Sequence, residues 1–556
     1  MSEPVVLALH GDARAHLLPA MANRHGLITG ATGTGKTVTL QVLAEAFSAM
    51  GTPVFLADIK GDLTGLGQPG LATPKMLDRL SGLGMPVPAW SAFPAALWDV
   101  FGQAGHPLRA TIQDLGPVLL ARMLSLNDTQ SGVLAVVFKV AQDEGQLLVD
   151  LDDLRAMLAD VAARAPTLQQ RYGNVSAASV GAIQRTLLVL ETQGAQAFFG
   201  EPALDVDDLM HLEPDGRGRI NILAADQLVG SPRLYAVFLM WLLSALYERL
   251  AEAGDLEKPR LVFFFDEAHL LFKDAPAALL EKVEQIVRLI RSKGVGVWFV
   301  TQNPADVPDT VLGQLGNRVQ HALRAYTPRD EQAVKVAART MRPNPGLDIQ
   351  AAMVDLAVGE ALVSLLDEKG RPSPTQRLWV TAPRSRIGPA DAAHLQGIKD
   401  SSVYLSKYDR AINRQSAHEV LAAGRDEAGV PSRSGAADNG TPMGGRQAGG
   451  ARSPSAGENA SAGRTSAGRQ ASSAPAKSAP SVPARPGPSA PTKTAPPTSA
   501  KPPRTWTDGV SDAVFGSVGP RGGRRDGLLQ VAVKTTVRTG VRALVRSLTS
   551  MFKGKR

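Results

Sequence analysis

The sequence predicts an α/β fold, a mostly parallel sheet that carries helices on both faces. Short apolar segments end in polar loops and are followed by amphipathic helical stretches, which is the order of elements in a parallel sheet. Several of these segments are apolar throughout, as expected for strands buried on both faces. The expected strands are Gly26–Thr29, Val54–Ala57, Ile220–Leu223, Leu261–Phe265, Val297–Thr301, Gln320–Ala325 and Ala361–Leu365.

A helical insertion is expected within the sheet domain, at about residues 109–199. Apolar residues there recur at helical spacing in four segments: Ile112–Leu124, Ser131–Asp143, Leu151–Ala163 and Ser179–Gln193. The most apolar run of the chain, Leu234–Tyr247, follows this insertion. It is shorter than the roughly 20 residues that span a bilayer, so we expect a buried helix.

The composition is that of a folded protein with an unusual tail. The chain has 556 residues, 44% of them hydrophobic, and no cysteine, which excludes disulfides and thiolate metal sites. We expect one folded domain at 1–423 and a disordered linker at 424–505, which is rich in Ala, Ser, Pro and Gly. The N-terminus has no secretory pattern, and the protein is expected to be cytoplasmic.

The basic charge belongs to the tail alone. Residues 424–556 contain 21 Lys and Arg but only 7 Asp and Glu, whereas residues 1–423 contain 39 and 45. Within the tail, 527–553 predicts a basic amphipathic helix: an apolar stripe and a basic stripe recur every four residues, at Val533, Val537, Val541 and Val545 and at Lys534, Arg538, Arg542 and Arg546. An anionic partner is expected for it. Nucleic acid, a membrane surface and the acidic core of the chain itself remain open.

A phosphate-binding loop is the clearest functional motif. Residues 30–37 match the pattern G-x-x-x-x-G-K-[ST], with an expected strand before them and a helix, Val38–Met50, after them. The glycines let the backbone N–H groups wrap around phosphates, the lysine supplies a charge, and the last hydroxyl binds Mg²⁺. The sequence therefore predicts ATP and Mg²⁺ as ligands, bound by Gly30, Thr32, Gly33, Thr34, Gly35, Lys36 and Thr37.

Two acids follow the expected strand Leu261–Phe265. A strand buried on both faces would hold Asp266 and Glu267 rigidly at the carboxyl edge of the sheet, where α/β proteins bind ligands. Asp266 is then expected to bind Mg²⁺, and Glu267 to activate the attacking water as a general base. The alternative is a pair of solvated acids that a helix dipole stabilises.

A neutral amide ends another expected strand. Gln302 follows Val297–Thr301, and an amide at that place can hydrogen-bond both a terminal phosphate and the attacking water. We therefore expect Gln302 to act as a polar sensor in catalysis. The alternative is an ordinary glutamine at the end of a strand.

These motifs together resemble the HerA–FtsK group of ring-forming motor ATPases, and above all bacterial proteins with a helicase HerA-like C-terminal domain. The resemblance is carried by the loop around Lys36, by residues 57–62 (ADIKGD), by residues 265–271 (FDEAHLL) and by residues 301–304 (TQNP). It extends over nearly all of residues 5–415. It implies a RecA-like P-loop NTPase fold of the ASCE type.

The resemblance also implies a homohexameric ring in which an arginine of the neighbouring subunit completes each ATP site. Arg324 matches that finger by its position, with Arg318 and Arg329 as nearby rivals, and Asp58 and Asp62 match an acidic loop beside the nucleotide. Only about 25 residues precede the phosphate loop, so the small β-barrel that begins HerA itself is not expected.

Three functions remain open. The first is a DNA-directed, helicase-like motor that moves on double-stranded DNA. The second is an ATPase that remodels a protein or membrane-associated assembly, and the third is a scaffold that binds nucleotide without turnover. Glu267 argues against the third. The letters D-E-A-H at residues 266–269 are also a mark of two-domain helicases, but no second α/β domain fits between Gln302 and the linker, so His269 is expected to pack or couple rather than to mark that class.

Overall fold

The computed structural model describes residues 3–254, 256–272, 277–427, 517–518 and 524–525. The chain divides into two compact units, residues 1–440 and 441–556. Of the second unit the structure describes only a short antiparallel pair, β13 (Ser517–Val518) and β14 (Arg524–Arg525). The predicted basic helix at 527–553 lies outside the described residues. So does the predicted linker, except for residues 424–427, which are the end of a helix.

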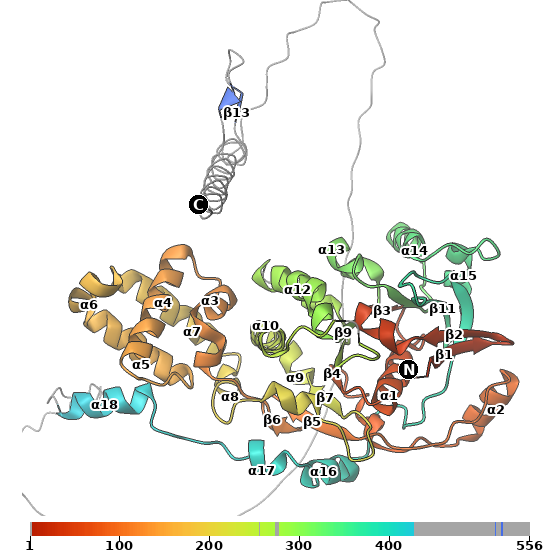
Figure 1. Cartoon of the computed structure of the whole chain (residues 1–556), viewed down its shortest axis with the longest axis horizontal. Coiled ribbons are helices and arrows are strands. Elements are labelled where there is room, and N and C mark those ends of the chain that lie inside the picture. The colour runs from red at the N-terminus through yellow and green to blue at the C-terminus, as the bar shows by residue number, and fades with distance from the viewer. Residues whose placement is uncertain (1–2, 255, 273–276, 428–516, 519–523, 526–556) are drawn as a thin grey trace, which may run out of the picture. The chain divides into compact units, whose positions relative to one another are not determined.

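Twelve strands of the described first unit form one sheet, in the order β2-β1-β12-β11-β10-β3-β9-β8-β4-β7-β5-β6. All neighbours from β10 to β6 pair in parallel, and the strands from β2 to β10 pair antiparallel (Figure 1). The bounds are β1 Val5–His10, β2 Ala13–Leu17, β3 Gly26–Thr29, β4 Val54–Asp58, β5 Ala95–Asp99, β6 His106–Pro107, β7 Ile220–Ala224, β8 Leu261–Phe265, β9 Val295–Thr301, β10 Asn317–Gln320, β11 Glu360–Ser364 and β12 Gln376–Val380. The predicted α/β class with a mostly parallel sheet is thus confirmed.

Six of the seven predicted strands are present, and the seventh prediction is wrong. Gln320–Ala325 was expected to be a strand, but β10 ends at Gln320. The reason is its partner: Gln320 pairs with Thr29, the last residue of β3, and beyond it β3 turns into the phosphate loop. The sequence did not predict β1, β2, β5, β6 and β12. β2, β1 and β12 lie at one end of the sheet, and β5 and β6 at the other. β2 is largely exposed, β12 is mostly half-buried and β6 has two residues, so these three carry little strand pattern.

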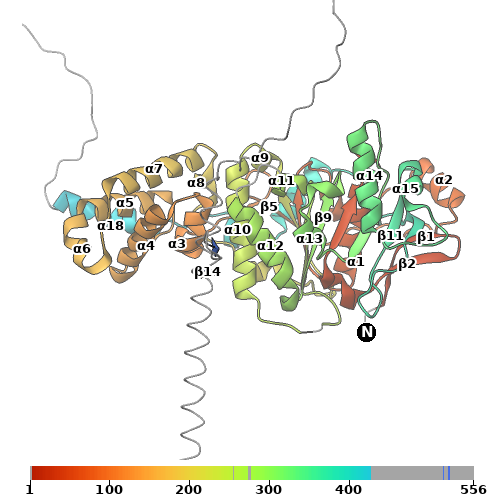
Figure 2. The ribbon, with the colours of Figure 1, turned by 90° about the horizontal axis from the view of Figure 1, so that it is seen from above.

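Each face of the parallel strands packs into its own core. In β8, Phe263 and Phe265 join one core, and Val262 and Phe264 join the other, because successive strand side chains point to opposite faces. The helix after β3, α1 (Lys36–Ala49), covers one face through Leu40, Leu43 and Phe47. The opposite face is covered by α10 (Pro232–Arg249) and α12 (Ala277–Leu289), as Figure 2 shows from above.

The predicted apolar run Leu234–Tyr247 lies within α10 and is almost wholly buried. Among the described residues, no helix is both long and apolar enough to cross a membrane.

Helices fill the region of the predicted insertion. They are α3 (Ile112–Met123), α4 (Asp128–Asp143), α5 (Leu151–Ala163), α6 (Ala165–Tyr172), α7 (Ala177–Glu191) and α8 (Ala195–Phe198). Capping boxes begin three of them, with Thr111, Asn127 and Asp150 as the N-caps. Helix α3 packs on α10 and α12, so the insertion shares one hydrophobic core with the sheet. The sequence pattern did not predict α6 and α8.

The remaining helices lie around the sheet and after it. They are α2 (Pro74–Gly82), α9 (Asp226–Val229), α11 (His269–Phe272), α13 (Asp309–Leu312), α14 (Pro328–Thr340), α15 (Ile349–Asp355), α16 (Ala392–Asp400), α17 (Leu405–Tyr408) and α18 (Ala417–Glu427), with 3₁₀ turns η1 to η5 between them. Helix α18 packs on α5, which returns the chain to the insertion before the described residues end.

A buried histidine joins the phosphate-loop strand to α12. His25, at φ +57°, precedes β3; its Nε2 lies 2.7 Å from the carbonyl oxygen of Val287, and the Val297 N–H donates to its Nδ1 at 3.0 Å. These bonds require a neutral ring with its hydrogen on Nε2. Burial, with a smaller effect of Arg291, lowers the pKa of His25 from 6.5 to about 4 against the opposing bond to Val287.

This histidine predicts acid sensitivity. Between pH 6.5 and 4 the unfolded chain binds a proton at residue 25 that the folded chain does not bind, so the free energy of unfolding falls as the pH falls. We expect His25→Gln to reduce this loss by about 2 kcal/mol between pH 7 and 5, because glutamine replaces the contacts without titrating. Denaturant unfolding of both proteins at each pH measures it. An unchanged pH dependence would contradict the assignment of a neutral, buried His25.

Candidate functional site

Four adjacent strands bring the predicted site residues together. β3, β9, β8 and β4 are neighbours in the sheet and run parallel, so their carboxyl ends meet at one edge. The phosphate loop follows β3, Gln302 follows β9, Asp266 and Glu267 follow β8, and residues 59–62 follow β4. The sequence placed each motif after its own strand, but the order of the strands, and hence the meeting of the motifs, comes from the tertiary structure.

The phosphate loop has the backbone that its glycines predict. Gly30, Gly33 and Gly35 have φ values of +150°, +77° and +116°, where a side chain would be strained. The Ala31 N–H donates to the carbonyl oxygen of Ala322 at 2.8 Å, which ties the loop to the segment after β10. Helix α1 begins at Lys36, so its N-terminal N–H groups and positive dipole end lie at the loop.

Lys36 is held inside the loop that it serves. Its Nζ donates to the carbonyl oxygens of Gly30 at 2.7 Å and Ala31 at 3.1 Å, and the residue is 6% exposed. Burial lowers the pKa of Lys36, against the attraction of Glu267, and the nearby charge of Lys60 lowers it further. A buried ammonium with only neutral partners gains from an anionic ligand such as a phosphate.

Asp266 has the features of a cation ligand. The residue is 2% exposed, and its Oδ2 has no hydrogen-bond partner among the described residues. Burial raises its pKa to about 6, against the attraction of Lys60. Thr37, in the first turn of α1, is half-buried and supplies a hydroxyl from the loop. A carboxylate and a hydroxyl oxygen beside a phosphate site fit Mg²⁺, which keeps most of its other ligands as waters and phosphate oxygens.

Glu267 lies in a strained turn and is engaged on both carboxylate oxygens. Its φ of +47° is uncommon for a residue with a side chain and is a feature of functional sites. Its Oε1 forms an ion pair with the Nζ of Lys60, and its Oε2 accepts a hydrogen bond from the Nε2 of Gln302 at 3.3 Å. Burial would raise the pKa of Glu267, but Lys60, Gln302 and His269 together hold it below its usual value.

Gln302 connects this carboxylate with the phosphate loop. The Oγ1 of Thr32 lies 3.4 Å from its Oε1, while its Nε2 donates to Glu267. The amide of Gln302 therefore contacts both the phosphate loop and the carboxylate of Glu267. His269 lies on the other side, with its Nδ1 3.2 Å from the Oε2 of Glu267, and it also lines a hollow of about 790 Å³ between α7, α10 and α12.

The sequence did not predict the roles of two residues at the site. Lys60 was seen only as one letter of the ADIKGD segment, yet it is the ion-pair partner of Glu267. His321 was not singled out, and it packs under the loop: its Nε2 lies 2.7 Å from the Oγ1 of Thr39 and its Nδ1 2.9 Å from the carbonyl oxygen of Glu360. Burial lowers the pKa of His321 to about 4, so the ring is neutral. No sequence pattern marks either role.

In the acidic segment after β4, Asp58 makes its hydrogen bonds within its own turn. The carboxylate of Asp58 accepts backbone N–H bonds from Gly61 at 2.8 Å, Asp62 at 3.2 Å and Leu63 at 2.9 Å. Burial nevertheless raises its pKa to about 6. Asp58 therefore shapes the turn that carries Lys60. Asp62 lies beside Lys60, whose charge opposes the effect of burial on the Asp62 pKa.

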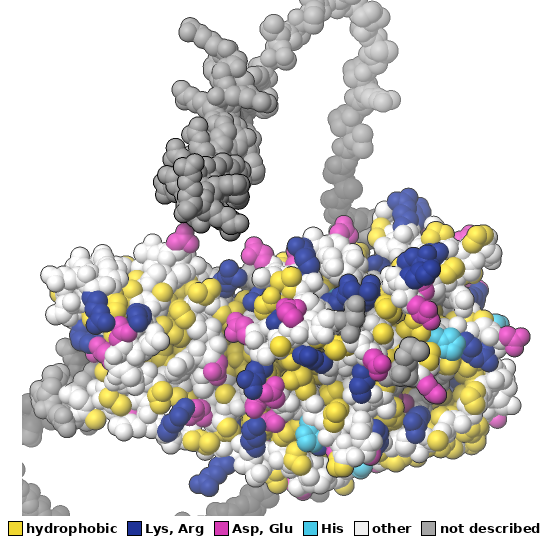
Figure 3. Space-filling view, viewed as in Figure 1, with side chains coloured by type: hydrophobic (Ala, Val, Ile, Leu, Met, Phe, Trp, Pro, Cys, Tyr) yellow, Lys and Arg dark blue, Asp and Glu magenta, His cyan; other side chains and the backbone are white. Residues whose placement is uncertain are grey.

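The predicted finger, Arg324, lies outside this cluster of contacts. Its side chain is exposed, and its Nη1 donates to the carbonyl oxygen of Val354 at 3.3 Å. Its rival Arg318 is largely buried and donates to the carbonyl oxygen of Leu312 at 2.9 Å. The side chain of Arg329 lies outside the described residues. In Figure 3, Lys and Arg side chains gather over the region of α14, where Arg324, Lys335, Arg339 and Arg342 are exposed.

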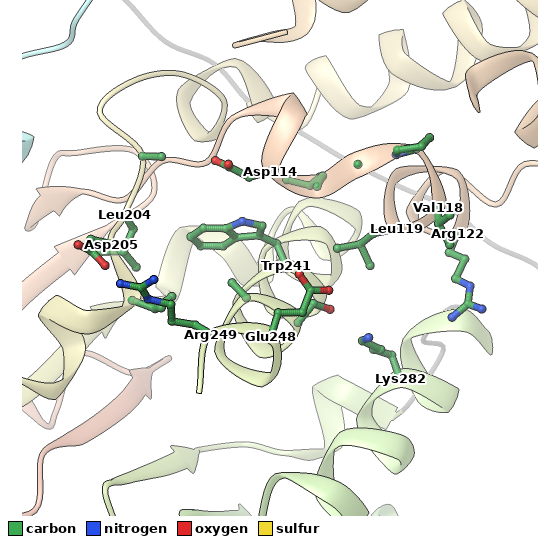
Figure 4. Close-up of a pocket in the computed structure, with 17 residues that line it drawn as sticks. Asp114, Val118, Leu119, Arg122, Leu204, Asp205, Trp241, Glu248, Arg249 and Lys282 are labelled. Carbon is green, nitrogen blue, oxygen red and sulfur yellow. The ribbon is translucent and has the colours of Figure 1, made fainter. Parts of the chain in front are cut away.

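A groove of about 780 Å³ lies elsewhere, between the helical insertion and the core. Asp114, Leu119 and Arg122 of α3 line one side, Trp241 and Glu248 of α10 lie opposite, and Lys282 of α12 is nearby (Figure 4). Helix α3 is kinked there, at Gly116 and Pro117. No predicted site residue lines this groove, so it is separate from the phosphate site.

Comparison with known proteins shows which family the chain resembles. A family model described as "Helicase HerA-like C-terminal" matches residues 4–484. Over 125 residues the chain is 30% identical to a "probable helicase" of Methanocaldococcus jannaschii, and the match covers 22% of this chain and 22% of that protein. The similar solved structures include the bacterial conjugative coupling protein TrwB (15% identity, 70% of this chain and 93% of that one, TM-score 0.45). They also include VirB4 of Thermoanaerobacter pseudethanolicus (16% identity, 70% and 98%, TM-score 0.42).

The tight packing of the loop generates a prediction. A Cβ added at Gly30 would lie 2.5 Å from the Cβ of His321, whereas one added at Gly33 meets no atom within 4 Å, although both glycines have positive φ. We therefore expect Gly30→Ala to weaken ATP binding at least about tenfold more than Gly33→Ala does. Titration with a fluorescent ATP analogue measures it, with thermal melts of both variants as the control for folding. Equal losses would mean that His321 does not support the loop.

Proposed function

The chain belongs to the helicase HerA-like C-terminal family, and on this premise we propose that it is an Mg²⁺-dependent ATPase. The observation that carries the proposal is the hydrogen-bonded connection from Thr32 through Gln302 to Glu267. It joins the loop that would bind the terminal phosphate to a buried carboxylate able to take a proton. ATP hydrolysis needs both at one place.

The binding roles follow from the geometry of the loop. The backbone N–H groups of residues 32–37 and the ammonium of Lys36 surround the β- and γ-phosphates. Thr37 and Asp266 would hold Mg²⁺, which would neutralise part of the phosphate charge. In the structure the Nζ of Lys36 makes its hydrogen bonds to two carbonyl oxygens of the loop. On binding, the phosphate oxygens replace these partners.

The catalytic roles belong to Glu267 and Gln302. Glu267 accepts a proton from the attacking water as the water oxygen bonds to the γ-phosphorus and the bond to the bridging oxygen of ADP breaks. Gln302 orients that water and responds to the γ-phosphate. The buried strand β8 supports this role because it holds the glutamate in a fixed place.

A neighbouring subunit completes the site in this proposal. The chain forms a homohexameric ring, and Arg324 of one subunit reaches the γ-phosphate bound by the next one. Support comes from the exposure of Arg324 and from the length, 3.3 Å, of its hydrogen bond to the carbonyl oxygen of Val354. Arg318 is a poorer candidate because its guanidinium is largely buried within its own subunit.

The substrate of the motor is double-stranded DNA in our first proposal. The family supports it, and so does the gathering of exposed Lys and Arg near α14. The second candidate is an ATPase that remodels a protein or membrane-associated assembly. The helical insertion favours it, since these helices form a separate surface on one side of the ATPase core.

The ATPase itself is tested by two substitutions. We expect Lys36→Ala to weaken ATP binding, because the phosphates lose their nearest cation. Glu267→Gln should bind ATP at least as tightly as the wild type and lose turnover on the order of 10²–10⁴-fold, because an amide cannot accept the proton. Binding titrations and phosphate release measure both. Near-normal turnover by Glu267→Gln would remove Glu267 from the role of general base.

The finger is tested by mixing two inactive proteins. Arg324→Ala lacks the finger and Lys36→Ala lacks the loop charge, so a mixed ring contains some sites with both groups intact. We expect the mixture to regain part of the ATPase rate, while each protein alone stays inactive. Sedimentation with ATP provides the control for assembly. A fully active, homogeneous monomer would contradict the ring.

The DNA role is tested by the ATPase rate with and without duplex DNA at two salt concentrations. A DNA motor should be stimulated several-fold, and the stimulation should weaken as salt rises, because salt competes for the DNA phosphates. Lys36→Ala controls for contaminating ATPases. A rate that DNA does not change would favour the second candidate.

A further inference from the structure

Lys60 contacts the predicted general base directly. Its Nζ forms an ion pair with Oε1 of Glu267, and the other oxygen, Oε2, is engaged by Gln302 and His269. Both oxygens of the carboxylate are therefore occupied by donors or a cation of the protein. Pairing with an ammonium stabilises the charged form of the carboxylate, so Glu267 in this pair is a weaker proton acceptor for an attacking water than Glu267 released from it.

The backbone places Lys60 rigidly at this spot. β4 pairs with β8 in parallel, with Ala57 opposite Phe265, so the turn after β4 lies beside the turn after β8. The carboxylate of Asp58 accepts three backbone N–H bonds and closes the turn, and Gly61 takes a φ of +72° that a side chain would disfavour. The position of Lys60 is thus built by the fold rather than left to a flexible loop.

The two partners of the ion pair differ in freedom. The side chain of Lys60 is 41% exposed, whereas that of Glu267 is 5% exposed. Lys60 also senses the charges of Asp266 and Asp62 and lies near enough to Lys36 to lower its pKa. Lys60 is therefore a second cation at the phosphate site, and it is the partner that can move.

We propose that Lys60 is a positioning residue that exchanges partners during the ATPase cycle. It holds Glu267 by the ion pair until a γ-phosphate enters, and it then pairs with that phosphate and releases one oxygen of Glu267 for the attacking water. The inference rests on the proposed ATPase function and adds to it a device that couples the arrival of ATP, but not ADP, to the freeing of the base.

The charges favour the exchange. A γ-phosphate with its oxygens carries more negative charge than one carboxylate and offers more acceptors to an ammonium. Because ADP lacks that group, it leaves the ion pair with Glu267 intact. The device would therefore make Lys60 a determinant of the preference for ATP over ADP.

The first experiment compares ATP and ADP affinity in the full chain. We expect Lys60→Met to weaken binding of a non-hydrolysable ATP analogue about tenfold and to leave ADP binding unchanged, and we expect Lys60→Arg to restore much of the difference. Lys75→Met, on exposed α2, is the control for the loss of one positive charge. Equal effects on ATP and ADP, or none on either, would overturn the proposal.

A double-mutant cycle tests the exchange itself. Glu267→Gln removes the competing carboxylate, so in the presence of Lys60 it should tighten binding of the ATP analogue, by about three- to tenfold. In the Lys60→Met background the same change should give a clearly smaller gain, because only the direct effect of the Glu267 charge on Lys36 and the phosphate remains. A gain of equal size without Lys60 would show that the carboxylate does not compete for this lysine.

These readouts separate the two proposals. All of them are binding measurements, so they remain decisive even if the wild-type chain hydrolyses no ATP. Failure of the ATPase proposal appears as wild-type binding that Lys36→Ala does not change. The exchange fails if binding depends on Lys36 as expected but Lys60→Met changes the affinities for the ATP analogue and for ADP equally, or changes neither. Thermal melts of each variant show whether a loss of binding is a loss of folding.

Discussion

Parallel hydrogen bonding among β3, β9, β8 and β4 holds every group of the site in place. Each strand is buried on both faces, so none of the four can slide or tilt without disturbing two hydrophobic cores. The carboxyl ends of the strands lie at one edge of the sheet, so the loops that follow them lie side by side. The contacts of Thr32, Gln302, Glu267 and Lys60 depend on it, because each comes from a different strand.

The same burial sets the electrostatics. Asp58, Asp266 and Glu267 are all nearly inaccessible, and burial alone disfavours their charged forms. The structure offsets this cost differently for each carboxylate. Backbone N–H groups bind Asp58, and an ammonium and an amide contact Glu267. Asp266 has the attraction of Lys60 and the backbone N–H of Glu267, while its Oδ2 has no hydrogen-bond partner among the described residues. Asp266 is therefore the carboxylate that gains most from a bound cation. Lys36 and Lys60 provide the positive charge that a phosphate would meet at this edge.

The helical insertion packs on the core that supports this site. α3 packs on α10 and α12, and their side chains continue the core that contains Phe263 and Phe265 of β8. His269 lies at the junction, with Glu267 on one side and the hollow beside α7 on the other. His269 therefore both contacts the predicted base and lines the hollow that α7 and α10 border.

The local chemistry of the site follows from residues that are neighbours in the chain. Gly30, Gly33 and Gly35 permit the loop, the apolar run before Asp266 requires a buried strand, and helical spacing predicts α3, α4, α5 and α7. These features depend on neighbours in the chain, so pattern and composition are enough. The sequence also placed Gln302 at the end of a strand, where the structure has it.

Which of these segments contact one another depends on the tertiary fold. The order of the strands brought Lys60 to Glu267 and His321 under the loop, over separations of 207 and 282 residues that leave no local pattern. It also ended β10 at Gln320, because its partner β3 leaves the sheet there, and this put Arg324 on the surface. Which strands pair and which residues are buried depends on segments that are far apart in the chain. The residues next to a strand therefore do not predict which strand it pairs with.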